Sequence, residues 1–259
     1  MYQFGLKLWS TNDNYVAEAI RLQQLGIYSY IELYAVPGSY DVYISVWKSL
    51  KIPFVIHAAH FRDGMNLAKR EKEAMNRLLI TEARQYADDL KADKIIIHPG
   101  IAGDIRETVR QLKQVKDQRI LIENKPYHAL DDGLICNGTA PEEIALIMDK
   151  TGVRFCLDIG HAICSANAHK QEPYAYLRQF LELKPKILHL TDGDINGMRD
   201  VHRHFGQGNF DLSRILALLP KEIEITVETE KDRTDRLDDF VADLNVIKNY
   251  VSTLEVGVV

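Results

Sequence analysis

Nine imidazole and carboxylate side chains in this sequence stand where they could bind metal ions or move protons. Each ends a short strand-like apolar run or lies in the segment that follows one: His57, His98, Glu123, Asp158, His161, His189, Asp200, His202 and Glu228. A lone histidine in such a place is usually a hydrogen-bonded core residue, and a lone glutamate is usually solvated or ion-paired. Nine such side chains occur at this kind of position, and together they instead indicate one shared site.

The types of these side chains select the chemistry. Their four carboxylates would bring four formal negative charges into one low-dielectric cavity, which requires cations. Imidazole nitrogen mixed with carboxylate oxygen, without cysteine, suits zinc, manganese, cobalt or iron better than a thiolate site or an all-oxygen calcium or magnesium cage. Nine donors exceed the capacity of one ion. We therefore expect a centre of two or three divalent ions, with zinc as first choice, manganese or cobalt as alternatives, and Glu123 as a candidate bridge.

Eight strand-like runs alternate with eight segments of helical period and would hold these side chains in place. The strand-like runs cover residues 2–9, 28–34, 53–57, 93–98, 119–123, 154–158, 186–190 and 222–228. The helical segments cover residues 15–26, 41–50, 66–91, 104–116, 140–150, 173–183, 210–219 and 237–251. Several runs, such as 94–98 and 120–123, are almost continuously apolar, which is typical of a parallel sheet buried on both faces.

Eight strand–helix units in about 250 residues predict a (β/α)8 TIM barrel. No linker or change of composition interrupts the alternation, so we expect residues 1–259 to form a single barrel domain. The alternative is a doubly wound open sheet, which usually carries a glycine-rich loop after its first strand. Residues 10–14 read STNDN and contain no glycine. In a barrel, chemistry belongs at the carboxyl ends of the strands, where the nine side chains would meet.

The composition is that of a globular chain with a large core. The chain has 259 residues, 46% of them hydrophobic, and a net charge of −5, which excludes disordered and disulfide-dense classes and any bulk attraction to nucleic acid or anionic membranes. Its three cysteines have no CxxC spacing and read as reduced thiols. Without a signal peptide or an apolar run of about 18 residues, we expect a cytoplasmic protein with no membrane span. Nothing in the sequence marks an oligomeric interface.

The motifs around the nine side chains resemble the endonuclease IV branch of the xylose isomerase-like barrels. The resemblance covers residues 55–230. Besides His57 it includes His-Pro-Gly at 98–100, Glu-Asn at 123–124, Asp-x-x-His at 158–161, His-Leu-x-Asp at 189–192, Asp-x-His at 200–202, Gly-x-Gly-Asn at 206–209 and Glu-Thr at 228–229. That superfamily includes metal-dependent sugar and sugar-phosphate isomerases and epimerases as well as abasic-site endonucleases.

The resemblance implies a role for each of the nine side chains. It implies that the isomerases and the endonucleases share four ligands: Glu123, Asp158, His189 and Glu228. It also implies that five others match the additional ligands of the trinuclear zinc endonucleases: His57, His98, His161, Asp200 and His202. Because none of the nine is missing, the resemblance favours a multinuclear centre.

Two reactions fit these residues. In an isomerase, one divalent ion polarises the carbonyl and hydroxyl of an open-chain sugar, and Glu123 and Glu228 exchange the carbon-bound proton as base and acid. In a phosphodiesterase, clustered zinc ions generate hydroxide and neutralise the phosphate and the leaving alkoxide. A catalytically silent metal-binding module is a third class, disfavoured because so charged a site persists poorly without function.

The loops argue against a DNA duplex as substrate. An abasic-site enzyme must hold phosphates and fill the gap left by a flipped nucleotide. Residues 34–43 contain no Lys or Arg, and residues 58–66 offer only Arg62, with His60 near the place where those endonucleases have a tyrosine. We expect Trp9 and Glu32 at the mouth of the pocket, where Trp9 stacks on a sugar and Glu32 accepts from its hydroxyls. Barrel-mouth packing and a solvated carboxylate are the alternatives.

Three basic residues are candidates for binding an anionic group of the substrate: Lys125, Arg199 and Arg203. A surface loop of mixed charge is the alternative for the two arginines. Residues 130–139 form an unusually long loop that we expect to act as a lid. The predicted function is isomerisation or epimerisation of a small sugar or sugar phosphate through Glu123 and Glu228. The alternative is an endonuclease IV-like multinuclear zinc phosphoester hydrolase.

Overall fold

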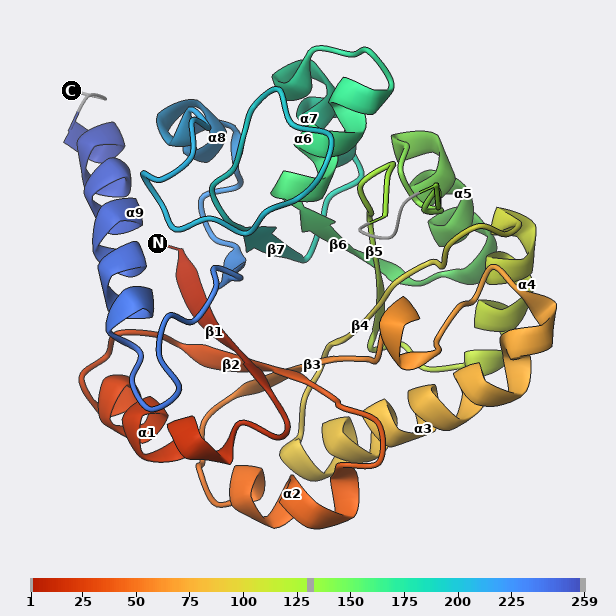
Figure 1. Cartoon of the computed structure of the whole chain (residues 1–259), viewed down its shortest axis with the longest axis horizontal. Coiled ribbons are helices and arrows are strands. Elements are labelled where there is room, and N and C mark those ends of the chain that lie inside the picture. The colour runs from red at the N-terminus through yellow and green to blue at the C-terminus, as the bar shows by residue number, and fades with distance from the viewer. Residues whose placement is uncertain (1, 130–132, 257–259) are drawn as a thin grey trace.

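The strands form a closed parallel barrel in the order β1 to β8, in a computed structural model that describes residues 2–129 and 133–256 (Figure 1). The strands are β1 (Gln3–Trp9), β2 (Tyr30–Tyr34), β3 (Phe54–His57), β4 (Ile95–Ile97), β5 (Ile120–Glu123), β6 (Arg154–Asp158), β7 (Ile187–Leu190) and β8 (Glu224–Val227). Each lies within its predicted run, and the predicted (β/α)8 barrel is confirmed.

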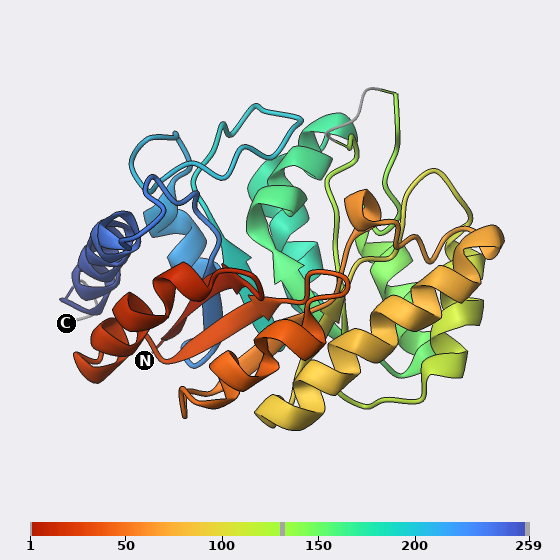
Figure 2. The ribbon, with the colours of Figure 1, turned by 60° about the horizontal axis from the view of Figure 1, so that its bottom comes forward.

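Helices surround the barrel (Figures 1 and 2). They are α1 (Val16–Gln24), α2 (Tyr40–Lys48), α3 (Glu73–Leu90), α4 (Ile105–Val115), α5 (Pro141–Thr151), α6 (Ile159–Ala168), α7 (Pro173–Glu182), α8 (Leu212–Leu218) and α9 (Asp238–Val256), with the 3-10 turns η1 (Asp13–Tyr15), η2 (Phe61–Asp63) and η3 (Arg70–Lys72). Figure 2 shows the loops after β5 and β7 rising on the same side of the barrel. Within the described ranges, no helix combines the length and apolarity of a membrane span.

Two segments differ from the prediction. The helix predicted over 66–91 begins only at Glu73. The Asn66 side chain instead accepts from the backbone of Ala68 and Ile101 and donates to the Ile101 carbonyl, which pins residues 66–68 over the next loop. Helix α6 was not predicted. It follows β6 directly and is buried along residues 159–166, so it has no polar face to give a helical period.

An apolar layer fills the barrel beneath the strand ends. This inner layer comprises Tyr30, Val55, Ile96, Leu121, Cys156 and Ile187. Each lies two residues before a candidate side chain, and positions two apart along extended chain face the same way. Gly5 makes room for the Tyr30 ring, because a Cβ at this glycine would lie 2.3 Å from it. The inner layer therefore closes the barrel interior below the candidate residues.

Candidate metal centre

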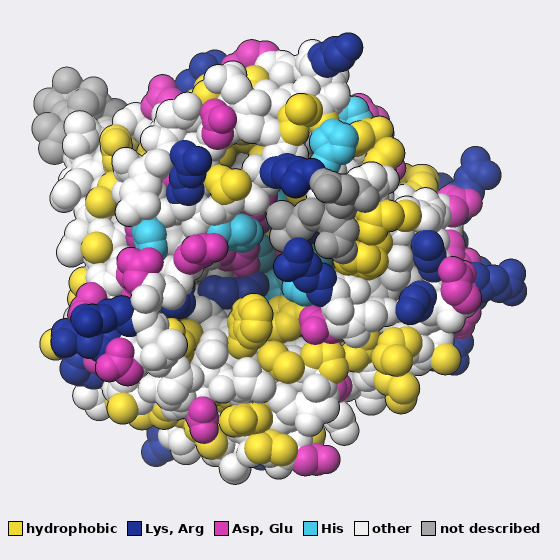
Figure 3. All heavy atoms as spheres, viewed as in Figure 1, with side chains coloured by type: hydrophobic (Ala, Val, Ile, Leu, Met, Phe, Trp, Pro, Cys, Tyr) yellow, Lys and Arg dark blue, Asp and Glu magenta, His cyan; other side chains and the backbone are white. Residues whose placement is uncertain are grey.

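A cavity of about 740 Å³ opens at the carboxyl ends of the strands. Figure 3 shows histidine and charged side chains gathered around this hollow. Seven of the nine candidates line it: His57, His98, Glu123, His161, Asp200, His202 and Glu228. The other two, Asp158 and His189, are buried. Asp158 lies 3.4 Å from His161, and His189 lies 3.2 Å from Glu228. The structure thus brings together all nine side chains that the sequence singled out.

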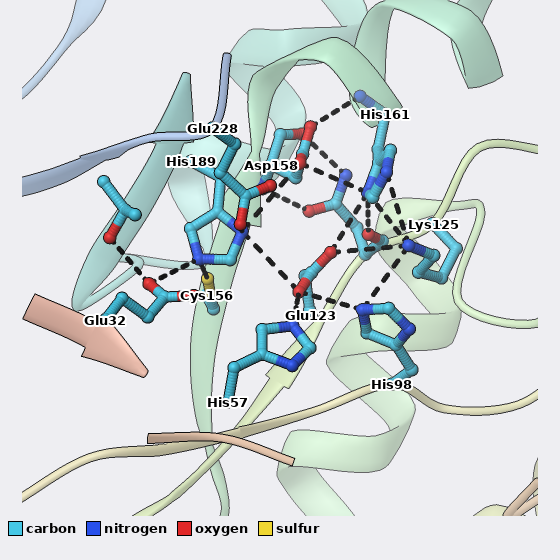
Figure 4. Close-up of polar contacts among 12 residues, drawn as sticks. Glu32, His57, His98, Glu123, Lys125, Cys156, Asp158, His161, His189 and Glu228 are labelled. Carbon is cyan, nitrogen blue, oxygen red and sulfur yellow. Dashed lines mark hydrogen bonds and ion pairs between the residues drawn. The ribbon is translucent and has the colours of Figure 1, made fainter. Parts of the chain in front are cut away.

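Glu123 lies at the centre of the arrangement (Figure 4). Its Oε2 is 3.0 Å from His57 Nε2 and 3.1 Å from His98 Nε2. Its Oε1 is 3.1 Å from His161 Nδ1. One carboxylate oxygen therefore faces one pair of imidazoles and the other faces a second group of donors, which is the geometry that a bridging carboxylate requires.

Donor atoms close enough to share an ion form further groups around Glu123. Asp158 joins Glu123 and His161, with 3.4 Å between Asp158 Oδ2 and His161 Nδ1. Asp200 Oδ2 lies 3.3 Å from His161 Nε2 and 3.0 Å from His202 Nε2, which makes another group. Both nitrogens of His161 thus face acidic oxygens, and the groups are contiguous.

His189 connects the two glutamates on the other side of the centre. Its Nδ1 lies 3.2 Å from Glu228 Oε1 and 3.6 Å from Glu123 Oε2. Its Nε2 lies 2.9 Å from Glu32 Oε2. Because both glutamates approach the same imidazole nitrogen, they flank a common point at the base of the cavity.

Two buried donor atoms test whether a cation suits this site. His189 Nδ1 and Asp200 Oδ2 are inaccessible to solvent and make no hydrogen bond to any described residue. Unpartnered buried polar atoms are costly, and a divalent ion bound by nitrogen and oxygen donors would satisfy both. The residues present therefore fit a divalent metal.

The electrostatics of the donors are those of a site short of positive charge. Burial raises the pKa of Asp158 to about 6, with a further contribution from the neighbouring Asp200. Burial also opposes ionisation of Glu123, but the hydrogen bonds and charges of its neighbours, among them the Lys125 ammonium, outweigh it and hold the pKa of this carboxyl well below its usual range. Burial lowers the pKa of His98, which favours the neutral imidazole that metal binding requires.

Cys156 borders the candidate donors and is a protonated thiol in the metal-free protein. Cys156 Sγ lies close enough to Glu123 and His189 to share an ion with them. Burial raises the pKa of this thiol to about 12, so it stays protonated at neutral pH. Cys136, Cys156 and Cys164 are all free, and we assign Cys156 to the inner layer.

Lys7 reaches the site, although the sequence analysis gave it no role. Its Nζ lies 2.5 Å from Glu32 and 2.6 Å from Glu228, and it lines the cavity. A sequence feature could have predicted this position. Lys7 is a charged residue between Leu6 and Leu8 in a strand-like run, and the period of two puts it on the opposite face from these apolar neighbours. A second lysine, Lys125, lies 3.3 Å from His161 Nε2 and 3.4 Å from His98 Nε2.

Three of the predicted substrate-binding residues line the cavity: Trp9, His60 and Lys125. The Trp9 side chain is left largely open to solvent, and its ring centre lies 5.7 Å from that of Tyr34. Glu32 was misplaced. It is fully buried below the cavity, because the pleat of β2 turns it inward beside Lys7, its register partner on β1.

The two predicted arginines are also corrected. Arg199 and Arg203 are exposed, and neither is among the described residues that line the cavity. The Arg203 backbone pairs with Asp192, which leaves its guanidinium on the outside, where it donates to the Gln207 carbonyl. The cations at the wall are instead Lys7, Arg62, Lys125 and Lys231.

The predicted lid lies partly outside the described residues, which omit 130–132. In the part that is described, Ile135 pairs with His128 and Cys136 pairs with Ile101. Cys136, Ile101 and Ala129 form a small apolar cluster that lines the cavity. The described part of this segment therefore supplies an apolar wall.

Comparisons with known proteins agree with this architecture. A family model described as xylose isomerase-like TIM barrel matches residues 28–250. The uncharacterized protein MJ1311 of Methanocaldococcus jannaschii is 25% identical over 194 residues, which cover 66% of this chain and 61% of MJ1311. Among solved structures, a D-tagatose 3-epimerase-like protein superposes with a TM-score of 0.74 at 17% identity, covering 99% of this chain and 100% of that one.

Endonuclease IV from Thermus thermophilus superposes with a TM-score of 0.71 at 20% identity, over 97% of this chain and 99% of that one. At these identities the two likenesses show a common fold for proteins with different reactions. The match of the family model to most of the sequence gives the assignment: the chain belongs to the xylose isomerase-like TIM barrel family.

Proposed function

We propose that this protein is a divalent-metal-dependent enzyme that isomerises or epimerises a small sugar or sugar phosphate. The observation that carries the proposal is the placement of Glu123 and Glu228, which both line the cavity and both approach His189 Nδ1, at 3.6 and 3.2 Å. Moving a proton off and onto carbon requires a base and an acid on either side of one substrate atom. Two carboxylates that flank a common point meet this requirement.

Four residues would hold the catalytic ion: Glu123, Asp158, His189 and Glu228. A bound ion supplies Lewis acidity that polarises the substrate carbonyl and the adjacent hydroxyl. Histidine and lysine charges hold the pKa values of Glu123 and Glu228 well below their usual range despite burial, so both glutamates are ionised at neutral pH. One ionised glutamate removes the carbon-bound proton as base; the other must first take up a proton from water or a substrate hydroxyl before it can return one to carbon as the acid.

The rest of the cavity suits a small molecule. Its volume of about 740 Å³ lies in the range of ligand pockets. Trp9 offers an exposed ring face to a sugar, and His60 lies on the same wall. Lys125 places an ammonium group beside the donors, where an anionic substituent such as phosphate would pair with it.

Hydrolysis of a phosphoester is the second candidate, and one observation favours it. The group formed by His161, Asp200 and His202 adds donors beyond the four residues that a single ion needs. Several ions together would supply hydroxide and neutralise charge on a phosphate and its leaving group. In that chemistry the five histidines among the donors would serve as ligands of the several ions.

Metal content and isotope exchange separate the two reactions. The purified protein is dialysed against zinc, manganese or cobalt, and its ions are counted by mass spectrometry. Turnover is followed by NMR in D₂O with a panel of ketoses and ketose phosphates, and in parallel with an abasic duplex and a small phosphodiester. Carbon-bound deuterium in the product supports the proposal. Three tightly bound zinc ions with phosphoester cleavage, and no deuterium incorporation, would overturn it in favour of the second candidate.

A further inference from the structure

A fully buried carboxylate lies beneath the candidate metal centre. Glu32 has no exposed surface and does not line the cavity. It accepts hydrogen bonds from Lys7 Nζ at 2.5 Å, from Thr226 Oγ1 at 2.6 Å and from His189 Nε2 at 2.9 Å. These donors come from β1, β8 and β7, so the carboxylate ties three strands together. A buried charge persists only when it is paired in this way.

The bond to Glu32 decides which way the His189 imidazole presents its lone pair. An ionised carboxylate can only accept, so the nitrogen that faces Glu32 carries the proton. In the neutral imidazole that a metal ligand must be, the other nitrogen, Nδ1, is then the unprotonated one, and it faces Glu228 and Glu123. Cys156 Sγ, 3.5 Å from Nε2, is the only other described hydrogen-bonding partner of that nitrogen, and its bond is weak. Glu32 therefore sets the tautomer that a metal ligand needs.

Lys7 connects this buried carboxylate to a second donor. Its single ammonium group bonds both Glu32 and Glu228 Oε1, at 2.5 and 2.6 Å. Lys7 lies opposite Glu32 in the register of β1 and β2. Neighbouring strands thus fix the spacing of Lys7 and Glu32, and the lysine holds Glu228 in line with them. Figure 4 shows Glu32, His189 and Glu228 on one side of the centre.

We propose that Lys7 and Glu32 are positioning residues of the metal centre. Glu32 orients His189 with Nδ1 toward the ion, and Lys7 fixes the carboxylate of Glu228 at the same point. Neither residue needs to touch the substrate for this role. The inference rests on the proposed metal-dependent function. It adds that two of the four proposed ligands, His189 and Glu228, depend on Glu32 and Lys7 for their orientation.

The test compares Glu32→Gln and Lys7→Met with the wild-type chain. Zinc affinity is measured by competition with a chromophoric chelator, and the hydrogen bond from His189 Nε2–H to Glu32 by the ¹H and ¹⁵N chemical shifts of that group in the metal-free protein. Loss of an outer partner of a metal ligand typically weakens metal binding by about 10- to 100-fold, and we expect a loss of this size in each variant. Lys7→Arg keeps the positive charge and should recover part of the affinity. Glu73→Gln, which loses surface pairs with Arg77 and Arg110, is the matched control and should bind zinc normally.

If Glu32→Gln does not fold, a second variant still tests the inference. Thr226→Val removes one hydrogen bond to Glu32 without changing any charge, and should weaken zinc binding several-fold. Folded variants with wild-type zinc affinity and unchanged His189 Nε2–H shifts would overturn the inference, and so would a lower melting temperature with both readouts unchanged, since that marks a purely structural role. A wild-type chain that binds no divalent ion would overturn the proposed function instead. The His189 Nε2–H shifts, read without metal, would still decide the role of Glu32.

Discussion

Asp158 Oδ1 accepts a hydrogen bond from the backbone N–H of His161 at 2.7 Å, so the residue that ends β6 also caps α6. An Asp-x-x-His sequence at this place therefore has two functions. The carboxylate satisfies the first turn of the helix, and the turn brings the His161 ring into the same candidate ligand group as Asp158. The spacing of three residues follows from the geometry of the cap.

Substitutions at Asp158 should separate these two functions. Asparagine caps helices as well as aspartate does, whereas alanine does not. We expect Asp158→Ala to lower the free energy of unfolding of the metal-free protein by about 1 kcal/mol relative to Asp158→Asn. Both variants should lose most of their zinc affinity. Urea unfolding in EDTA checks the first expectation and chelator competition the second. Equal stability of the two variants would show that the cap does not contribute.

The pH dependence of stability should distinguish Asp158 from its asparagine variant. Burial raises the pKa of this carboxyl to about 6 in the folded protein, from 3.8. An acid with a raised folded pKa favours folding while protonated, so its cost appears as the pH rises from about 4 through 6. At neutral pH that cost approaches about 3 kcal/mol. In EDTA, Asp158→Asn should therefore gain stability relative to wild type between pH 4 and 7. A difference that stays constant across this range would contradict the explanation.

The two glutamates proposed as base and acid should each be required for turnover. Glu123→Gln and Glu228→Gln remove the proton-transferring group but keep the shape, and we expect losses of about 10²- to 10⁴-fold or more in kcat. Circular dichroism should show a folded barrel. Glu224→Gln is the control, because Glu224 lies at the other end of β8 and pairs with Lys94. Near wild-type rates in either active-site variant would rule out this acid–base pair.

Lys125 should limit the number of ions that the centre holds. Its ammonium lies 3.5 Å from Glu123 Oε1 and within 3.4 Å of His98 and His161, where it repels a neighbouring dication. We expect Lys125→Met to bind zinc more tightly, or in greater number, than wild type, and to raise KM more for a sugar phosphate than for the neutral sugar. Lys231→Met is the control, since Lys231 lines the cavity but donates to the Thr229 carbonyl and not to any of the nine candidate ligands. Unchanged zinc content would count against this role.

The convergence of the donors that lie on strands was predictable because it depends on strand geometry alone. A period of two and a parallel register send side chains such as His57 and Glu123 to one end of the barrel. The buried position of Glu32 could not be predicted. The sequence does not show which strand residues face inward until a partner such as Lys7 is known. Arg203 was misjudged for a related reason. Its direction depends on a backbone pairing with Asp192, a long-range contact that no local pattern announces.

Trp9 should report substrate binding directly. The chain has two tryptophans, of which Trp47 is fully buried and Trp9 is 55% exposed at the cavity wall. A sugar stacked on Trp9 would remove its ring from water, so substrate should shift the fluorescence of the wild-type protein to shorter wavelength. Trp9→Phe should abolish the shift, and Trp9→Ala should raise KM about fivefold, in line with a stacking contribution of about 1 kcal/mol, with little change in melting temperature. Leu25→Ala, at another exposed apolar residue, is the control. A fluorescence shift that persists in Trp9→Phe would move the binding surface elsewhere.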